Sequence, residues 1–154
     1  MKKTVATNPK AQKDYQIIQT IEAGIQLKGA EVKSLREAKV DLKESFARIE
    51  NNEIILYNMY IGPYEQASYL NVEPKRPRKL LLHKKEIHRL LGRLTQRGFT
   101  LVPLRVYFNE RNLAKIELAL CKGKKIYDRR EEVKRKEEEK KIQKIIKVKK
   151  SKYL

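Results

Sequence analysis

Lysine and arginine side chains grouped around a tyrosine are the residues of this sequence best suited to chemistry. Residues 124–130 read Lys-Lys-Ile-Tyr-Asp-Arg-Arg, and residues 75–89 hold seven Lys or Arg against one acid, Glu86. Such cations bind phosphate whatever the base sequence, and a tyrosine ring can stack on an unpaired base. Both segments therefore indicate a nucleic-acid partner. For Tyr127, packing at a strand end is the alternative interpretation.

No arrangement of residues suited to catalysis accompanies these cations. His83 and His88 are five positions apart with no cysteine near them, which does not match zinc spacing, and we expect His88 to be an exposed helical residue. Asp14 and Glu22 belong to no metal-binding motif. Cys121 ends an apolar run, where a buried thiol is expected. We therefore expect that the protein is not an enzyme and that it binds no metal and no cofactor.

The positive charge is concentrated towards the end of the chain. The formal net charge is +18, and residues 122–154 carry half of it. Residues 131–141 are good helix formers, but the first apolar cluster of this segment comes only at 142–146. We expect a basic tail that is disordered when free and helical on a partner, the alternative being a tail that only solvates the protein. Apolar runs too short for a membrane span and a single cysteine favour a cytoplasmic protein without membrane contact.

Most of the remaining sequence has the pattern of β-strands. Residues 15–27 alternate apolar and polar side chains, and Gly24 among them suggests a bulge or bend. Residues 45–50 and 53–61 flank Asn51-Asn52, which favours a hairpin. Residues 100–108 and 113–121 flank residues 109–112 in a second hairpin. Prolines at 74 and 77 mark a loop, whose cations we expect to be solvated or paired with an outside anion.

Two helices interrupt these strands. Residues 84–97 place apolar side chains at 87, 90, 91 and 94, with Gly98 just past the end. A shorter helix is expected near residues 31–38. Short strands with few helices predict a mainly β fold that closes into a small barrel, and barrels of this size often bind nucleic acid. The expected organisation is a barrel domain over residues 1–121 and a basic tail over residues 122–154.

Several stretches in collinear order resemble a known family. They are residues 8–11 (Asn-Pro-Lys-Ala), 14–15 (Asp-Tyr), 22–25 (Glu-Ala-Gly-Ile), 27–36 (Leu-Lys-Gly-Ala-Glu-Val-Lys-Ser-Leu-Arg), 78–83 (Arg-Lys-Leu-Leu-Leu-His), 98–104 (Gly-Phe-Thr-Leu-Val-Pro-Leu) and 122–130 (Lys-Gly-Lys-Lys-Ile-Tyr-Asp-Arg-Arg). Together they resemble the small protein B family, the tmRNA-binding proteins of bacterial trans-translation. The resemblance covers about residues 8–130, and residues 31–36 and 78–83 are its most specific blocks.

This resemblance implies a small antiparallel β-barrel of oligonucleotide-binding type with flanking helices. It also implies a non-catalytic adaptor that binds the elbow of the tRNA-like domain of tmRNA, one monomer per tmRNA. The complex enters a ribosome stalled on a message without a stop codon. Residues that match the RNA-contacting side, or lie in the matching stretches, are Asn8, Lys10, Tyr15, Glu22, Lys33, Arg36, Arg78, Lys79, Leu81, His83 and Lys115. We expect Glu22 to accept hydrogen bonds from base edges or a ribose 2′-OH, or to orient a lysine.

The same resemblance implies a second partner for the end of the chain, the small ribosomal subunit with its rRNA. Candidates for the decoding centre and the empty mRNA channel are Gly123, Lys124, Lys125, Tyr127, Asp128, Arg129, Arg130, Lys134, Lys141, Ile145 and Ile146. Two departures from the family pattern are Arg129, in place of the usual lysine, and Pro9, in place of a basic residue. The alternatives are a ribosomal protein, a general structured-RNA-binding barrel, or an RNA-processing enzyme.

Overall fold

The computed structural model describes residues 3–123, except for the side chains of residues 68–70. The compact unit that holds these elements is Met1–Lys122. The strands are β1 (Lys3–Thr7), β2 (Tyr15–Ile25), β3 (Val40–Asp41), β4 (Phe46–Glu50), β5 (Glu53–Tyr57), β6 (Tyr60–Ile61), β7 (Arg78–Leu81), β8 (Phe99–Phe108) and β9 (Ala114–Gly123). The helices are α1 (Pro9–Asp14), α2 (Gly29–Arg36) and α3 (Lys84–Leu94), with a 3-10 turn at Glu65–Leu70.

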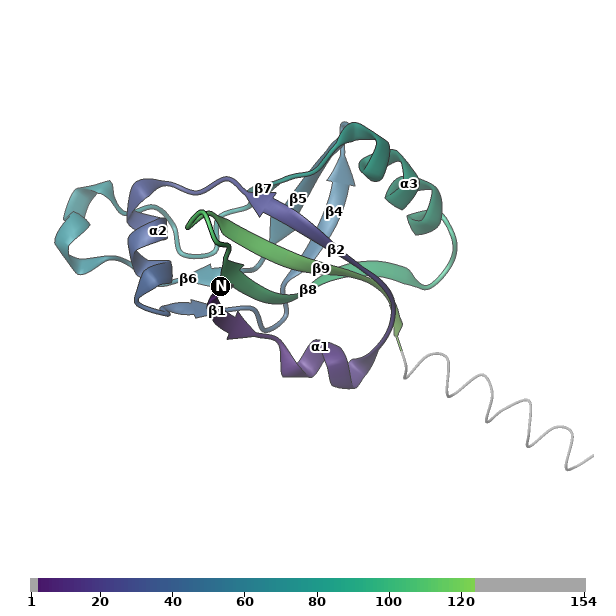
Figure 1. The fold of residues 1–154 in the computed structure, drawn as a ribbon, viewed down its shortest axis with the longest axis horizontal. Helices are drawn as coiled ribbons and strands as arrows, with labels where there is room; N and C mark the ends of the chain where they lie inside the picture. Colours follow the sequence, from purple (N-terminus) through teal and green to yellow (C-terminus); the bar gives the residue numbers. More distant parts are fainter. Residues whose placement is uncertain (1–2, 124–154) are drawn as a thin grey trace, which may run out of the picture. The chain divides into compact units, whose positions relative to one another are not determined.

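The main sheet closes into a barrel. Its strands follow the order β8, β4, β5, β7, β2, β9. Strand β9 also pairs with β8, which closes the ring, and β1 forms a further pair with β8. The pairs β4–β5, β5–β7, β2–β7 and β8–β9 are antiparallel. Figure 1 shows β2, β9 and β8 side by side, with α1 and α3 on opposite sides of the strands. The prediction of a small antiparallel β-barrel is confirmed.

Both predicted hairpins are present. Asn51 and Asn52 adopt positive φ angles of 50° and 63° between β4 and β5, as a tight two-residue hairpin turn requires. In the second hairpin the Asn109 side chain accepts hydrogen bonds from the backbone N–H groups of Arg111 and Leu113, each at 2.9 Å. Asn112 then takes the left-handed conformation, with φ 60°. Asparagine tolerates this conformation, so the turns follow from local sequence.

Strand β2 differs from its predicted alternation. Ile17 is 37% exposed and Ile18 is 42% exposed, and the buried part of the strand is Ala23–Ile25. The reason is that β7 is short and its register with β2 covers only Gly24 and Ile25. Gly24 marks no break in that register. A Cβ atom there would lie 3.2 Å from the Leu81 Cβ atom, so the glycine allows the two strands to approach closely.

The helices also differ in extent from their expected ranges. Helix α2 begins at Gly29 and ends at Arg36, and α3 ends at Leu94, so Gly98, with φ 90°, belongs to the following turn. Helix α1 was not predicted. Its N-cap is Asn8, whose side chain accepts a hydrogen bond from the Ala11 N–H group, and Pro9 occupies the first helical turn, where a missing N–H costs nothing.

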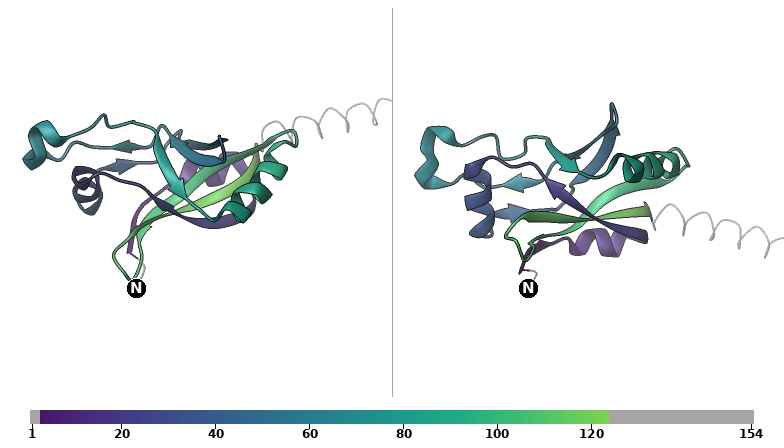
Figure 2. Two further views of the ribbon diagram at one scale, coloured as in Figure 1. Left: turned by 90° about the horizontal axis from the view of Figure 1, so that it is seen from above. Right: turned by 45° about the horizontal axis from the view of Figure 1, so that its top comes forward.

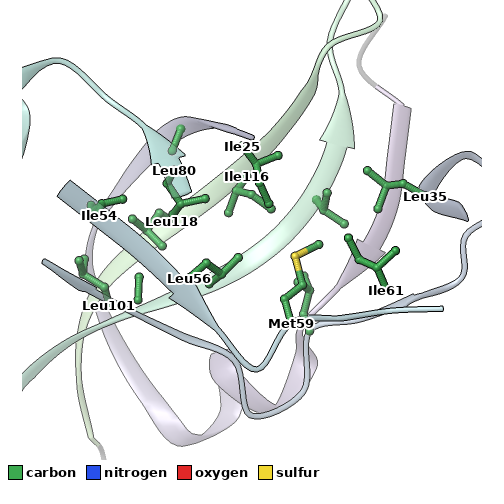
Figure 3. Packing of buried hydrophobic residues seen from close by; sticks show 14 of the residues in the cluster. Ile25, Leu35, Ile54, Leu56, Met59, Ile61, Leu80, Leu101, Ile116 and Leu118 are labelled. Atoms are coloured by element: carbon green, nitrogen blue, oxygen red, sulfur yellow. The ribbon is translucent and has the colours of Figure 1, made fainter. Parts of the chain in front are cut away.

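The barrel interior is filled by aliphatic side chains from all parts of the ring. In Figure 3, Ile54, Leu80, Leu101, Ile116 and Leu118 converge on one another. A smaller cluster lies beneath α1 and contains Ala11, Val102, Leu104, Ala119 and Cys121. The Cys121 thiol is buried, as predicted, and burial raises its pKa to about 12.

Within residues 3–123, no cluster of three His, Cys, Asp or Glu side chains is arranged to hold a metal ion. Over the same range, no helix has the length and apolar character needed to cross a membrane.

Candidate nucleic-acid interface

A groove between β2, β7 and β9 collects several of the residues predicted from the sequence. It has a volume of about 480 Å³ and is lined by Glu22, Gly24, Leu81, Leu82, His83, Glu86 and Lys115. We call it the Glu22 groove. Leu81 is 52% exposed there and provides an apolar contact surface. Glu22, Leu81, His83 and Lys115 are thus brought together from three separate parts of the chain.

A buried tyrosine fixes the acid of this groove. The Tyr107 hydroxyl donates a hydrogen bond to Glu22 Oε2. Tyr107 is 1% exposed, whereas Glu22 is exposed to solvent. Burial and this hydrogen bond raise the pKa of Tyr107, so the phenol remains a donor. The arrangement presents a carboxylate acceptor at the surface, suited to a ribose hydroxyl or a base amino group.

Cations surround this acceptor. Lys115 lies opposite Tyr107 in the register of β8 and β9. Lys79 lies two residues from Leu81 on β7 and forms an exposed ion pair with Glu53 at 3.2 Å. His83 is exposed and stands at the N-cap position of α3. The exposed ion pair is worth little in water, so Lys79 can exchange Glu53 for a phosphate at small cost.

A second depression, the Lys10 cavity, lies between α1 and β4 and has a volume of about 450 Å³. Its lining includes the predicted residues Lys10 and Tyr15 together with Phe46 and Arg48. The Arg48 guanidinium lies 5.3 Å from the Phe46 ring centroid. Neither Lys10 nor Tyr15 lines the Glu22 groove, so the sequence-predicted set divides between two sites.

Asn8 also borders the Lys10 cavity, but its side chain is used within the protein. It is 4% exposed, and Nδ2 donates to the carbonyl oxygens of Pro103 at 2.9 Å and Leu42 at 3.2 Å. Its Oδ1 atom caps α1 through the Ala11 N–H group. The hydrogen-bonding groups of Asn8 therefore hold α1 on the barrel, and a contact of this residue with RNA stays a prediction.

Arg78 is the clearest correction to the sequence interpretation. Its side chain is fully buried, and Nε donates to Glu31 Oε2 at 2.6 Å. Its Nη1 and Nη2 atoms donate to the carbonyl oxygens of Met59 at 2.5 Å and Pro74 at 2.9 Å. The expectation that this cation is solvated or paired with an outside anion is therefore wrong, since all its sides meet protein acceptors.

Glu31 is the anion that permits this burial. Arg76 Nε donates to Glu31 Oε1 at 3.1 Å, and the Lys28 N–H group donates to the same oxygen at 2.8 Å. Burial alone raises the pKa of Glu31, but the hydrogen bonds from Arg76, Lys28 and Arg78 outweigh it, and the pKa lies below its ordinary value. The cluster of Glu31, Arg76 and Arg78 ties α2 to the segment before β7.

The remaining predicted residues lie elsewhere. Lys33 and Arg36 are exposed on α2, near the rings of Tyr64 and Phe108 at 5.5 Å and 6.0 Å, and line neither cavity. Gly123 is the last residue of β9. The ribosome candidates Lys124, Lys125, Tyr127, Asp128, Arg129, Arg130, Lys134, Lys141, Ile145 and Ile146 lie outside the described residues. Sequence reasoning missed Tyr107, whose partner Glu22 is 85 residues away.

A small closed barrel in a chain of net charge +18, with a groove that combines a lysine, a fixed carboxylate acceptor and an exposed leucine, defines the class of basic β-barrel proteins that bind nucleic acid. Comparison with protein families narrows this class. The family model described as SmpB protein matches residues 5–148. The chain belongs to the SmpB family.

Individual relatives agree with this assignment. The SsrA-binding protein of Pseudothermotoga lettingae is 57% identical over 143 residues, which are 93% of this chain and 96% of that protein. The SsrA-binding protein of Thermus thermophilus is 59% identical over 131 residues, 85% of this chain and 91% of that protein. A solved structure described as "tmRNA-SmpB: a journey to the center of the bacterial ribosome" matches with a TM-score of 0.66 and 60% identity, and covers 77% of this chain and 83% of that chain.

Proposed function

We propose that this chain is a tmRNA-binding adaptor of trans-translation, which rescues ribosomes stalled on mRNA that lacks a stop codon. Membership of the SmpB family supports this function. The structural observation that carries the proposal is the Glu22 groove, in which Glu22, Leu81, His83 and Lys115 converge. These residues match RNA-contacting positions of the family, and they leave a surface with both cations and an acceptor.

Recognition in the groove combines three kinds of contact. Lys115 and Lys79 bind phosphate oxygens and a ring N–H group of His83 donates to another, which supplies affinity without sequence preference. Leu81 packs against a ribose or base. Glu22, held by Tyr107, accepts a hydrogen bond from a 2′-OH or an amino group, a contact that requires a particular placement of the nucleotide. The folded shape of the RNA therefore determines which molecule fits.

The tail has a separate task in this proposal. Residues 1–121 bind the tRNA-like domain, and residues 122–154 enter the decoding centre and the empty mRNA channel, where the basic tail becomes helical and Tyr127 stacks on an rRNA base. The composition of the tail supports this division, since its cations suit an RNA-lined path. The protein acts in the cytoplasm as a monomer, one per tmRNA, and catalyses no reaction.

Competition binding tests this function. The full-length chain is titrated with the tRNA-like domain of tmRNA, with an ordinary tRNA, and with a fragment of small-subunit rRNA at one salt concentration. The adaptor binds the tRNA-like domain at least about tenfold more tightly than either competitor, the equivalent of one well-placed hydrogen bond to a charged group. Equal affinities would instead support a general RNA-binding barrel. Stoichiometric co-purification with all small subunits would identify a ribosomal protein.

A further inference from the structure

A second groove begins where the Glu22 groove ends. It lies between β2 and α3, has a volume of about 420 Å³, and is lined by Gln19, Ile21, Glu86, Arg89, Leu90 and Arg93. We call it the Arg89 groove. Leu90 is 2% exposed, and in the left view of Figure 2 strand β2 passes beside α3. None of the sequence-predicted site residues lines this groove.

Two arginines of α3 are available along this groove. Arg89 and Arg93 are four residues apart, so they lie on one face of the helix, one turn from each other. Both are exposed. In the part of the chain that the structure describes, neither has an acidic partner within ion-pair distance or an aromatic ring beneath its guanidinium.

Other arginines of the barrel are engaged within the protein. Arg76 and Arg78 bind Glu31, and Arg105 binds Glu117. Two guanidinium groups on adjacent turns repel each other, which is unfavourable for the free helix. A planar guanidinium can donate two parallel hydrogen bonds to the oxygens of a phosphate, so an anionic backbone removes this repulsion.

The two grooves share one residue, Glu86, and are therefore continuous. Lys115, His83 and Glu22 line the Glu22 groove, Arg89 and Arg93 line the Arg89 groove, and Glu86 lines both. The continuous surface thus offers cations for phosphate oxygens and carboxylates that can accept hydrogen bonds from ribose hydroxyl groups.

We propose that the RNA bound in the Glu22 groove continues along α3, where Arg89 and Arg93 bind its phosphate backbone. This inference rests on the proposed function and extends the contact surface of the same RNA. Glu86, at the junction, faces the sugar of the nucleotide between the two sets of cations. The occupant of the Arg89 groove is thus the tRNA-like domain itself.

The test compares two charge-matched double variants of the full-length chain. The first is Arg89→Gln with Arg93→Gln. The control is Lys43→Gln with Arg111→Gln, which removes two exposed cations that line neither groove. Affinity for the isolated tRNA-like domain is measured over a range of salt concentrations. The first variant loses about tenfold or more in affinity, and its log–log salt slope falls by about one per arginine, whereas the control keeps the wild-type slope.

Equal salt slopes for both variants would overturn the inference. So would a loss that appears only with ribosomes and not with the isolated RNA, because the arginines would then contact the ribosome. Thermal unfolding midpoints of both variants equal to that of the wild type exclude a folding defect, as expected for exposed side chains. If the wild-type chain itself shows no preference for the tRNA-like domain, the proposed function fails, and this result is distinct from failure of the Arg89 groove alone.

Discussion

The Glu22 carboxylate is held by a hydroxyl group that lies beneath the barrel surface. Because the Tyr107 hydroxyl donates to one oxygen of Glu22, the rotamer of the acid is restricted before RNA arrives. A preorganised acceptor loses less side-chain entropy on binding. In the proposed function, Tyr107 is thus a positioning residue for Glu22, through which it influences RNA binding.

Substitution of Glu22 tests its contact with RNA. The variant Glu22→Gln weakens binding of the tRNA-like domain by about 1.5 kcal/mol, roughly tenfold, because a charged acceptor is replaced by a neutral one. Equilibrium titration with the RNA measures the change. Unchanged affinity of this variant would show that Glu22 does not touch the RNA.

A double-mutant cycle tests the role of Tyr107. Tyr107→Phe removes the hydroxyl and keeps the buried ring, so the barrel stays folded and RNA binding weakens by less than in Glu22→Ala. In the Glu22→Ala background, Tyr107→Phe has no further effect, because the group that it positions is absent. Losses that simply add in the double variant would show that Tyr107 acts independently of Glu22.

The buried ion pair of Glu31 and Arg78 contributes to the free energy of unfolding. Glu31→Gln leaves the Arg78 guanidinium buried without its anion, and the free energy of unfolding falls by about 3–5 kcal/mol. The matched control is Glu117→Gln, whose pair with Arg105 is partly exposed and is worth about 1 kcal/mol or less. Chemical denaturation measures both values. Equal losses would show that burial of Arg78 needs no specific partner.

The pH dependence of stability follows from the same pair. The pKa of Glu31 in the folded protein lies below its ordinary value of 4.5. Its stabilisation is therefore complete above about pH 4.5 and is lost as the pH falls through the lower, folded pKa. The difference in unfolding free energy between the wild type and Glu31→Gln shrinks below pH 4.5. A constant difference down to pH 2 would contradict the assignment.

At the scale of elements, one glycine determines how closely β2 and β7 approach. In Gly24→Ala, the new Cβ atom meets the Leu81 Cβ atom at 3.2 Å, so a strand must shift and stability falls by about 1–3 kcal/mol. Because Leu81 lines the Glu22 groove, RNA binding weakens as well. Gly92→Ala on α3 is the control, since no atom lies within 4 Å of its Cβ position.

The control variant changes the free energy of unfolding in the opposite direction. Alanine stabilises a helix interior relative to glycine, so Gly92→Ala raises the free energy of unfolding by about 0.5–1 kcal/mol and leaves RNA affinity unchanged. Thermal unfolding and RNA titration measure both variants. Stabilisation by Gly24→Ala would show that the two strands do not meet as described.

Elements that depend on local sequence were predictable, and those that depend on distant partners were not. The turn at Asn51-Asn52 follows from the conformational tolerance of two adjacent residues. The exposure of Ile17 depends on the length of β7, which lies more than fifty residues later in the chain. Helix α1 was missed although Asn8-Pro9 is a typical helix start, because a short helix gives no periodic apolar pattern.

The site shows the same limit on the scale of the whole molecule. Resemblance to the family identified Glu22, Leu81 and Lys115 as candidates, and the fold brings them together. The resemblance could not distinguish Arg78 from the exposed cations. The partner of Arg78, Glu31, is 47 residues away, and the burial of Arg78 follows only from the closed barrel. Arg89 and Arg93 have no distinguishing sequence signal beyond their spacing, and the groove beside β2 is visible only in three dimensions.

At the scale of the whole molecule, the positive charge is divided between two parts of the chain. Half of the net charge of +18 belongs to residues 1–121, and half belongs to residues 122–154. The central claim is that these two shares serve two different contacts, one with tmRNA and one with the ribosome.

A chain truncated after Arg130 tests this claim most directly, with affinity for the tRNA-like domain and tagging on stalled ribosomes measured side by side. We expect the truncated chain to bind the tRNA-like domain as the full-length chain does, because the Glu22 and Arg89 grooves are intact. We expect tagging to be abolished. Loss of RNA binding in solution, or tagging at the full-length rate, would contradict this claim.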